Sequence, residues 1–245
     1  MAIALARCLH ALDLPHTLLE LPGTAPDLYH ILMGDRNMPK GYRYWTESVC
    51  FGTPSADTGK TWASGCTEWA PLAPDRILEK WDAECAGRLL ERVNRPAAIL
   101  DIGSAWTDPA HGGLLAEADL ILLVCDPSPL HLSRGEAARN WGRLGKLKNQ
   151  GRQIRIIANK AAGFKGKQEW LEALPDRPVC QIPEIPSTAV LSALWEGKLI
   201  ADQPAIYPVL SAALEPVISA VLDTCGHPGK RKSIWRRFGK AGKQV

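Results

Sequence analysis

Two polar residues directly follow apolar runs of the sequence, and both have side chains that could bind a ligand. Asp101 follows the run 97–100, and Asn159 follows the run 154–158. If these runs are strands of an open α/β sheet, both side chains lie at its carboxyl edge, where such sheets bind ligands. A carboxylate there can hold a magnesium ion through water, and an amide can pair with an adenine edge. Locally, each residue could instead be a turn residue, with Asp101 capping the turn after its strand, and for Asn159 taken alone the turn interpretation is favoured.

The segment 52–61, GTPSADTGKT, ends like a phosphate-binding loop. That motif needs a glycine five residues before its Gly-Lys pair, and Pro54 occupies this position. The residues that follow, WASGCTEW, lack a helical pattern, so no helix N-terminus would meet a phosphate. We therefore do not interpret this segment as a nucleotide-binding loop.

The positive charge of the chain is concentrated at its carboxyl end. The formal net charge is +3, but residues 230–245 carry seven cations and no acid, so removing them leaves −4 on residues 1–229. The composition, 46% apolar and 22% charged, is typical of a globular protein. An acidic body argues against a protein that binds nucleic acid over its whole surface.

The basic tail also carries apolar side chains at helical spacing. Ile234, Trp235 and Phe238 share one face, as in helices that lie in a membrane interface. Tryptophan favours the headgroup boundary and cations favour anionic lipid, so we expect a weak, reversible membrane contact. The cations expected to contact the lipid are Lys230, Arg231, Lys232, Arg236, Arg237 and Lys240. A disordered basic end and a nucleic-acid contact remain as alternatives.

Strands that alternate with helices indicate a doubly wound, mostly parallel α/β sheet. The pattern predicts strands at 16–21, 97–102, 120–125, 154–159 and 179–182, and helices at 2–12, 26–33, 75–93, 110–117, 131–150, 167–174, 187–196 and 205–223. The all-apolar run 120–125 is typical of a strand covered on both faces. We expect one domain over 1–226 and a basic amphipathic tail over 227–245.

Residues 35–75 differ from the rest because they are rich in Gly, Thr, Ser and Trp. Two alternating stretches, YRYWTESVCF and KTWASGCTEWAPL, predict a hairpin or two irregular strands. The aromatic residues Tyr44, Trp62 and Trp69 could contact a partner or simply pack the hairpin.

Seven cysteines with no CxxC pair and no export signal predict free thiols in a reducing cytoplasm. Cys50 and Cys66 could face each other across the expected hairpin. No His/Cys/Asp cluster has zinc spacing, and no apolar run is suited to span a bilayer.

Taken in order, these segments resemble the MinD/ParA family of deviant Walker-type P-loop ATPases. The likeness rests on ALARCLHALDLPHTLLELPGTAPDLYHILMG, AAILDIGSA, ADLILLVCDPSPLHLSR, IRIIANK and IPEIPSTAVLSALWEGKLI, and on a tail like the membrane-targeting helix of MinD. The resemblance implies a P-loop NTPase sheet with Asp101 in the magnesium shell. It also implies that Asn159, Pro183 and Glu184 lie near the nucleotide base.

Two departures limit what the resemblance implies. The family's first strand and its KGGxGK[ST] loop would lie before Met1, so the chain as given lacks the Walker A element. We expect either a true start upstream of Met1, a degenerate relative, or a chain completed by a partner strand. The family's Asp-x-Asp reads Glu20-Leu21-Pro22 here. Pro22 cannot orient a hydrolytic water, and Glu20 is the only catalytic candidate.

We therefore expect a MinD/ParA-like spatial organiser or partner-binding protein with weak or lost ATP binding and hydrolysis, and whether it is an enzyme stays open. It would be cytoplasmic and peripheral at the inner face of the cell membrane. Its expected partners are an anionic membrane surface, an unidentified protein and a second copy of the chain. One alternative is a functional ATPase that uses ATP and magnesium through a P-loop upstream of Met1. The other is a DNA-associated partition protein. Division, partition and pilus or conjugation machinery all remain open.

Overall fold

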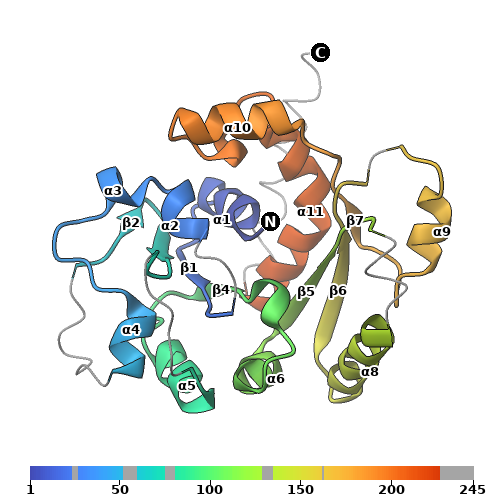
Figure 1. Cartoon of the computed structure of the whole chain (residues 1–245), viewed down its shortest axis with the longest axis horizontal. Coiled ribbons are helices and arrows are strands. Elements are labelled where there is room, and N and C mark those ends of the chain that lie inside the picture. Colours follow the sequence, from blue (N-terminus) through green and yellow to red (C-terminus); the bar gives the residue numbers. More distant parts are fainter. Residues whose placement is uncertain (24–26, 52–59, 75–80, 129–134, 162, 227–245) are drawn as a thin grey trace. The chain divides into compact units, whose positions relative to one another are not determined.

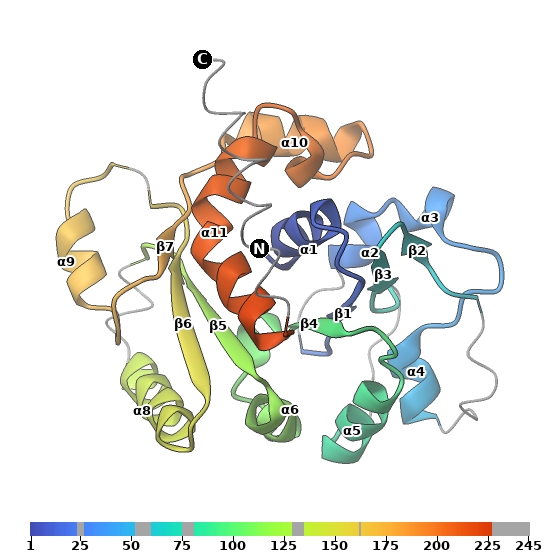
Figure 2. The ribbon, with the colours of Figure 1, turned by 180° about the vertical axis from the view of Figure 1, so that it is seen from behind.

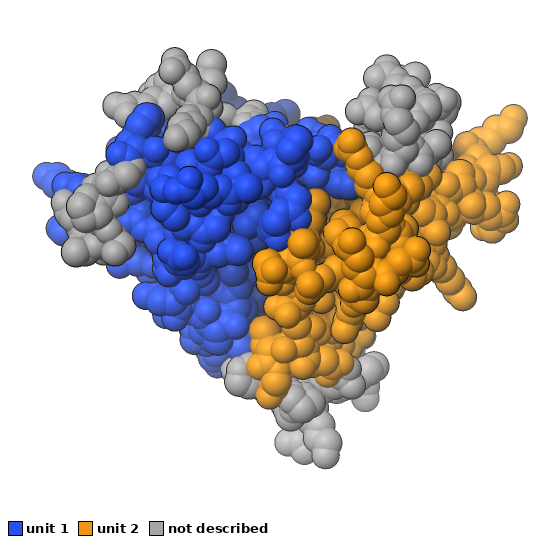
Figure 3. All heavy atoms as spheres, turned by 90° about the horizontal axis from the view of Figure 1, so that it is seen from below, with its two compact units in different colours: residues 1–114, 191–203 blue, residues 115–190, 204–245 orange. Residues whose placement is uncertain are grey.

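The computed structural model describes residues 1–23, 27–51, 60–74, 81–128, 135–161 and 163–226, without the side chains of 105 and 135–140. They form two compact units (Figure 3). Unit 1 contains residues 1–114 and 191–203, and unit 2 contains the described residues of 115–190 and 204–245. The single domain expected over 1–226 therefore stays a prediction.

Unit 1 is built on a four-stranded sheet in the order β2-β3-β1-β4 (Figure 1). Its strands are β1 (His16–Glu20), β2 (Ala63–Ser64), β3 (Thr67–Ala70) and β4 (Ala97–Asp101). β1 pairs in parallel with β3 on one side and β4 on the other, whereas β2 and β3 form an antiparallel hairpin. All five residues of β1 are buried, because both of its edges are paired and helix α1 packs against the sheet.

The helix α1 (Ala2–Ala11) leads directly into β1. It ends because Asp13 adopts a left-handed conformation and Pro15 cannot continue a helix. Five residues on one side of α1 are buried, and the helix contacts β1, β3 and β4. The predicted helix 2–12 and strand 16–21 are thus confirmed.

The insert 35–75 is only partly the hairpin that its alternating pattern predicts. The second stretch forms the β2-β3 hairpin, but the expectation of a strand in the first stretch is wrong. There the chain forms α4 (Trp45–Cys50), and α3 (Gly34–Asn37) precedes this stretch. Trp45, Thr46 and Val49 are buried, and this i, i+1, i+4 spacing suits a helix that packs against α5.

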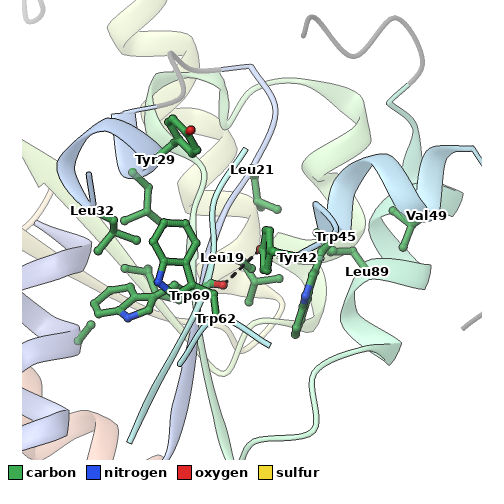
Figure 4. Packing of buried hydrophobic residues seen from close by; sticks show 14 of the residues in the cluster. Leu19, Leu21, Tyr29, Leu32, Tyr42, Trp45, Val49, Trp62, Trp69 and Leu89 are labelled. Carbon is green, nitrogen blue, oxygen red and sulfur yellow. Dashed lines mark hydrogen bonds between the residues drawn. The ribbon is translucent and has the colours of Figure 1, made fainter. Parts of the chain in front are cut away.

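The aromatic residues of the insert belong to the core of unit 1. Trp62 and Trp69 are buried among leucines of the sheet, and the Tyr42 hydroxyl donates to the Trp69 carbonyl oxygen at 3.3 Å (Figure 4). Tyr44 is half-buried and stacks edge-on against Tyr42. The packed-hairpin interpretation of these side chains is therefore the one that the structure supports.

The helix predicted to begin at Asp75 begins later. α5 (Ala83–Glu91) starts after Asp82, whose carboxylate accepts the Cys85 N–H at 2.8 Å as an N-cap. Trp81 and Asp82 are not helical, and 75–80 lie outside the described residues. The shorter elements of unit 1 are α2 (Asp27–Ile31), η1 (Gly103–Ala105), η2 (Pro109–His111) and η3 (Ile200–Asp202).

A buried polar network lies at the amino end of the unit 1 sheet. His16 Nδ1 donates to the Leu14 carbonyl at 2.8 Å, and its Nε2 accepts from the Thr67 hydroxyl at 3.1 Å. Next to them, the Thr17 hydroxyl donates to Glu68 at 3.0 Å. Burial is the main cause that lowers the pKa of His16, so the imidazole is held neutral.

Unit 2 is built on a three-stranded parallel sheet in the order β5-β6-β7 (Figure 2). Its strands are β5 (Leu120–Cys125), β6 (Gln153–Ala158) and β7 (Cys180–Gln181). Its helices are α8 (Gly135–Asn149), α9 (Lys167–Glu172) and α11 (Tyr207–Thr224). α6 (Gly112–Glu117) and α10 (Ser187–Trp195) contain residues of both units. The predicted α/β alternation is confirmed.

Two of the edge strands, β4 and β5, are long apolar strands that have one paired neighbour each within the described residues. β4 pairs with β1, and β5 pairs with β6. As a result β5 is less covered than its apolar sequence predicts, and Val124 is 39% exposed. Apolar edge strands of this kind can accept a further strand.

Within the described part of the chain, no helix has the length and apolarity needed to cross a membrane.

Candidate functional site

The carboxyl edge of the unit 1 sheet brings two acidic residues together. Glu20 ends β1 and Asp101 ends β4, and they are partners in the parallel register. A cavity of about 530 Å³ opens there, and its lining includes Glu20, Asp101, Asp27 and Ser104. Met1 and Ile3, at the start of α1, line it too. The sequence predicted Glu20 and Asp101 as candidates, and the structure places both at one cavity.

Glu20 is a buried brace, by which we mean that its carboxyl group connects three segments of the chain through hydrogen bonds. Its Oε1 accepts the Leu28 N–H at 2.8 Å, and its Oε2 accepts the Leu72 N–H at 2.9 Å. The carboxyl thereby ties the end of β1 to α2 and to the segment after β3. Burial raises the pKa of Glu20, and the nearby charges of Asp101 and Asp27 add to this rise. Each carboxylate oxygen of Glu20 therefore already accepts one backbone N–H.

Asp101 is exposed at the same carboxyl edge of the unit 1 sheet. Its Oδ1 accepts the N–H of Gly103 at 3.2 Å, and Gly103 has a positive φ of 57°. The side chain therefore caps the turn after its strand, as the local sequence allowed. The same carboxylate also faces the cavity, so both interpretations of Asp101 are compatible with its position.

The cavity fits a hydrated cation better than a nucleoside triphosphate. The carboxylates of Asp27 and Asp101 and the hydroxyl of Ser104 are oxygen donors of the kind that magnesium prefers. In the described chain, however, no group of three acidic, histidine or cysteine side chains is placed to ligate a metal directly. Among the described residues, those that line the cavity include three carboxylates and no lysine or arginine. Such a lining would repel the phosphates of ATP.

A second polar group lies at the carboxyl edge of the unit 2 sheet. The Asn159 amide, directly after β6, donates to Asp126 Oδ1 at 2.7 Å. The Lys160 ammonium donates to Asp126 Oδ2 at 2.9 Å. Lys160 has a φ of +52°, an uncommon conformation for a residue with a side chain.

Sequence reasoning missed Asp126, although the signal was available. Asp126 directly follows the apolar strand 120–125, just as Asp101 follows its own strand. The carboxylate joins the ends of β5 and β6 and holds the amide of Asn159 in place. The side chain of Asn159 is therefore held in place by Asp126, which a turn residue would not require.

Pro183 and Glu184 lie at the same edge of unit 2. They follow Ile182, whose N–H donates to the Ala158 carbonyl at 2.8 Å, and both are exposed. The structure thus gathers Asn159, Pro183 and Glu184 in one unit, while Asp101 and Glu20 belong to the other. The predicted membrane-binding residues, from Lys230 to Lys240, lie outside the described residues, as does most of GTPSADTGKT.

Comparison with known proteins identifies the fold but not a sequence relative. No protein-family model and no curated protein sequence matches the chain. Among solved structures, a chain of the MinC:MinD cell division protein complex from Aquifex aeolicus is similar, with a TM-score of 0.64 and 18% identity. The alignment covers 91% of this chain and 89% of that one. The chain has a MinD/ParA-like fold.

Two further structures support the MinD/ParA-like fold. A ParA family ATPase from Chlorobium tepidum TLS aligns with a TM-score of 0.62 at 17% identity, over 87% of this chain and 91% of that one. A putative plasmid partition protein from Borrelia burgdorferi B31, bound to AMPPNP, aligns with a TM-score of 0.63 at 14% identity. That alignment covers 89% of this chain and 91% of the other. The predicted fold class and the resemblance are confirmed.

Proposed function

We propose that this MinD/ParA-like chain is a spatial organiser that binds a partner protein and has weak or lost ATP binding and hydrolysis. It attaches reversibly to the inner face of the cell membrane through residues 227–245. The observation that carries the loss of ATP binding is the acidic lining of the unit 1 cavity, with Glu20 held by two backbone N–H groups.

Electrostatics favour this proposal over strong ATP binding. A nucleoside triphosphate needs amide and cationic donors around its phosphates. The feature of the cavity that favours an anion is the amino end of α1, marked by Met1 and Ile3. A helix terminus corresponds to about half a positive charge. Three carboxyl groups line the same cavity, and the exposed pair Asp27 and Asp101 outweighs that half charge when ionised.

Partner binding is proposed from the fold and from the tail. One structure with this fold is part of the MinC:MinD cell division protein complex. If this chain likewise binds a protein or a second copy, two weak tails on one assembly would bind a membrane far more tightly than one tail.

The topology of unit 1 favours one alternative, a functional ATPase whose P-loop precedes Met1. α1 and β1 have the form of the second half of a β-α-β unit, whose first strand would run parallel to β1. Both edges of β1 are taken by β3 and β4, whereas β4 has one paired neighbour in the described sheet. A strand upstream of Met1 would therefore add beside β4, and its loop would enter the cavity at Met1.

Calorimetric titration with Mg-ATP separates the two candidates. We expect the 245-residue chain to show no saturable binding up to about 1 mM nucleotide. Saturable binding that requires magnesium and is lost in Asp101→Asn would overturn the proposed loss of ATP binding. The DNA upstream of Met1 should be translated in frame as a second check. A strand followed by a Gly-Lys-rich loop would favour the ATPase.

Vesicle co-sedimentation tests the membrane proposal. The chain should sediment with vesicles that contain anionic phosphatidylglycerol and not with neutral phosphatidylcholine vesicles. Trp235→Glu should abolish this binding. Trp195→Glu is the matched control, because Trp195 is 87% exposed on α10 and is outside the tail. Equal sedimentation of wild type and Trp235→Glu would overturn the membrane contact, and tight salt-dependent binding to duplex DNA would favour the partition alternative.

A further inference from the structure

Two cysteines lie on neighbouring helices that pack against the same core. Cys50 is the last residue of α4, and Cys85 lies in the first turn of α5. The two helices pack against each other, Cys85 belongs to the buried core cluster of unit 1, and Cys50 packs against that cluster. The Cys85 side chain is also one of the neighbours that raise the pKa of Cys50. Both are free cysteines. The sequence suggested Cys66 as the residue facing Cys50, and this was wrong because 45–50 form a helix rather than a strand of a hairpin.

The surroundings give the two thiols different roles. Cys85 has no exposed surface, whereas Cys50 is partly exposed and can be reached from solvent. Asp82 accepts the Cys85 N–H and holds the first turn of α5 in place. The Arg88 guanidinium donates to Cys85 Sγ at 3.4 Å, where it can compensate negative charge on that sulfur.

We propose that Cys50 and Cys85 form an oxidation site that closes to a reversible intramolecular disulfide when it meets a hydroperoxide. Within the described residues no group of three or more His, Cys, Asp and Glu side chains is placed to hold a metal ion, so the two cysteines are not part of a larger ligand cluster there. In a reducing compartment, disulfides of this kind are transient and redox-responsive.

The chemistry balances in two steps. The Cys50 thiolate attacks a peroxide oxygen, the O–O bond breaks, and Cys50 becomes a sulfenic acid while the peroxide leaves as water or an alcohol. The Cys85 sulfur then attacks the Cys50 sulfur, the S–S bond forms, and the S–O bond breaks to release water with the proton of the Cys85 thiol. Two electrons pass from the two sulfurs to the peroxide.

The first of these steps is slow at neutral pH. Burial, and then the neighbouring Cys85, raise the pKa of Cys50 to about 12, so little thiolate is present. Oxidation should accordingly speed up as the pH rises. Cys8 is a useful comparison, because burial also raises its pKa to about 12 but it lies in α1, within the core beside β1.

The disulfide would connect two helices that lie on either side, along the chain, of the segment that contains Leu72. It would join the ends of the stretch 51–84, which contains the β2-β3 hairpin and Leu72. The Leu72 N–H is one of the two donors to Glu20. Oxidation would therefore restrict the segment that positions this carboxyl. The inference does not depend on the proposed function.

Peptide mapping of the oxidised protein tests the proposal. The 245-residue protein is treated with hydrogen peroxide, its remaining thiols are alkylated, and it is digested without reductant. We expect one linked species that joins the Cys50 and Cys85 peptides and that dithiothreitol separates. Cys50→Ser and Cys85→Ala should each abolish it, and Cys8→Ser should leave it unchanged. In Cys85→Ala, a dimedone adduct should accumulate at Cys50.

A rate measurement distinguishes a specific reaction between Cys50 and Cys85 from a chance cross-link. Arg88→Gln should slow the second step, conversion of the Cys50 sulfenic acid to the disulfide, about tenfold, the effect of losing one hydrogen bond to a charged group. Dimedone trapping follows the lifetime of the sulfenic acid and so isolates this step. Circular dichroism confirms that this variant is folded, and Cys50→Ser, at a partly exposed position, serves if Cys85→Ala does not fold. A Cys50–Cys66 linkage, or sulfinic acid at Cys50 without any cross-link, would overturn the proposal.

Discussion

Glu20 and Asp101 end neighbouring parallel strands in register, yet only Asp101 keeps its carboxylate exposed. Glu20 is 6% exposed because β1 is the inner strand and α2 and the segment after β3 close over its end. Asp101 ends β4, which has one paired neighbour among the described strands. These two acidic residues at one edge of the sheet therefore have different roles. Glu20 stabilises the fold through its hydrogen bonds, whereas Asp101 faces the cavity.

Removal of the Glu20 carboxyl should destabilise the protein strongly. Glu20→Ala leaves the N–H groups of Leu28 and Leu72 buried without their acceptor, which costs about 2–4 kcal/mol of the free energy of unfolding. Urea denaturation measures this change. Asp101→Asn is the matched control at the same edge, and its effect should stay within about 0.5 kcal/mol because the side chain is exposed. Equal stability of Glu20→Ala and wild type would show that Glu20 is not a brace.

The buried His16 should make stability fall in mild acid. Burial lowers its pKa from the ordinary value of 6.5, so below that pH the unfolded chain takes up a proton that the folded chain does not. The free energy of unfolding therefore decreases as pH drops from 6.5 toward the folded pKa, by at most about 1.4 kcal/mol per pH unit.

Urea titrations at a series of pH values on either side of 6.5 check the histidine prediction. In His16→Gln, the free energy of unfolding should no longer show the decrease with falling pH that His16 causes. His30→Gln is the matched control, because His30 is exposed on α2. An identical pH dependence in wild type and His16→Gln would contradict it.

The left-handed backbone conformation of Lys160 should lower the stability of the protein, and two substitutions test this. Both Lys160→Gly and Lys160→Ala remove the exposed ion pair with Asp126, which contributes at most about 1 kcal/mol. Only glycine adopts the φ of +52° without strain, so Lys160→Gly should be more stable than Lys160→Ala by about 1–2 kcal/mol. Thermal unfolding of the two variants gives the difference directly. No difference would mean that this conformation carries no strain.

The tryptophans of the insert should behave as core residues. Trp69 is 2% exposed, and Trp69→Ala should cost about 3–5 kcal/mol of the free energy of unfolding. Phe51 is 67% exposed, so Phe51→Ala should change stability by less than about 0.5 kcal/mol. Denaturant unfolding compares the two. A partner-binding role without a packing role for Trp69 would show the opposite pattern, with stability unchanged.

Most elements could be predicted from local pattern because apolar periodicity is a local property. The apolar runs that became β1, β4, β5 and β6 stood out in the sequence, and so did the spacing of α1 and α11. The stretch WTESVC shows where this method fails, because its alternation and its helical face are both present in six residues. Packing against α5 decided between them.

The candidate site was predictable in residue type but not in role. Because strands that run parallel end at one edge of their sheet, sequence reasoning could place Asp101 and Asn159 there. It could not show that Asp126 binds both Asn159 and Lys160, or that Leu28 and Leu72 occupy the oxygens of Glu20. These partners are distant along the chain, and only strand order and loop closure bring them together.

The sequence by itself therefore determined the α/β class, the acidic body with its basic tail, and which carboxylates follow strands. These properties depend on the order of residues alone. Tertiary structure alone decided that Glu20 is a brace while Asp101 faces the cavity, and that Cys50 meets Cys85 instead of Cys66. The physical reason is that burial and hydrogen-bond partners depend on which segments meet in space.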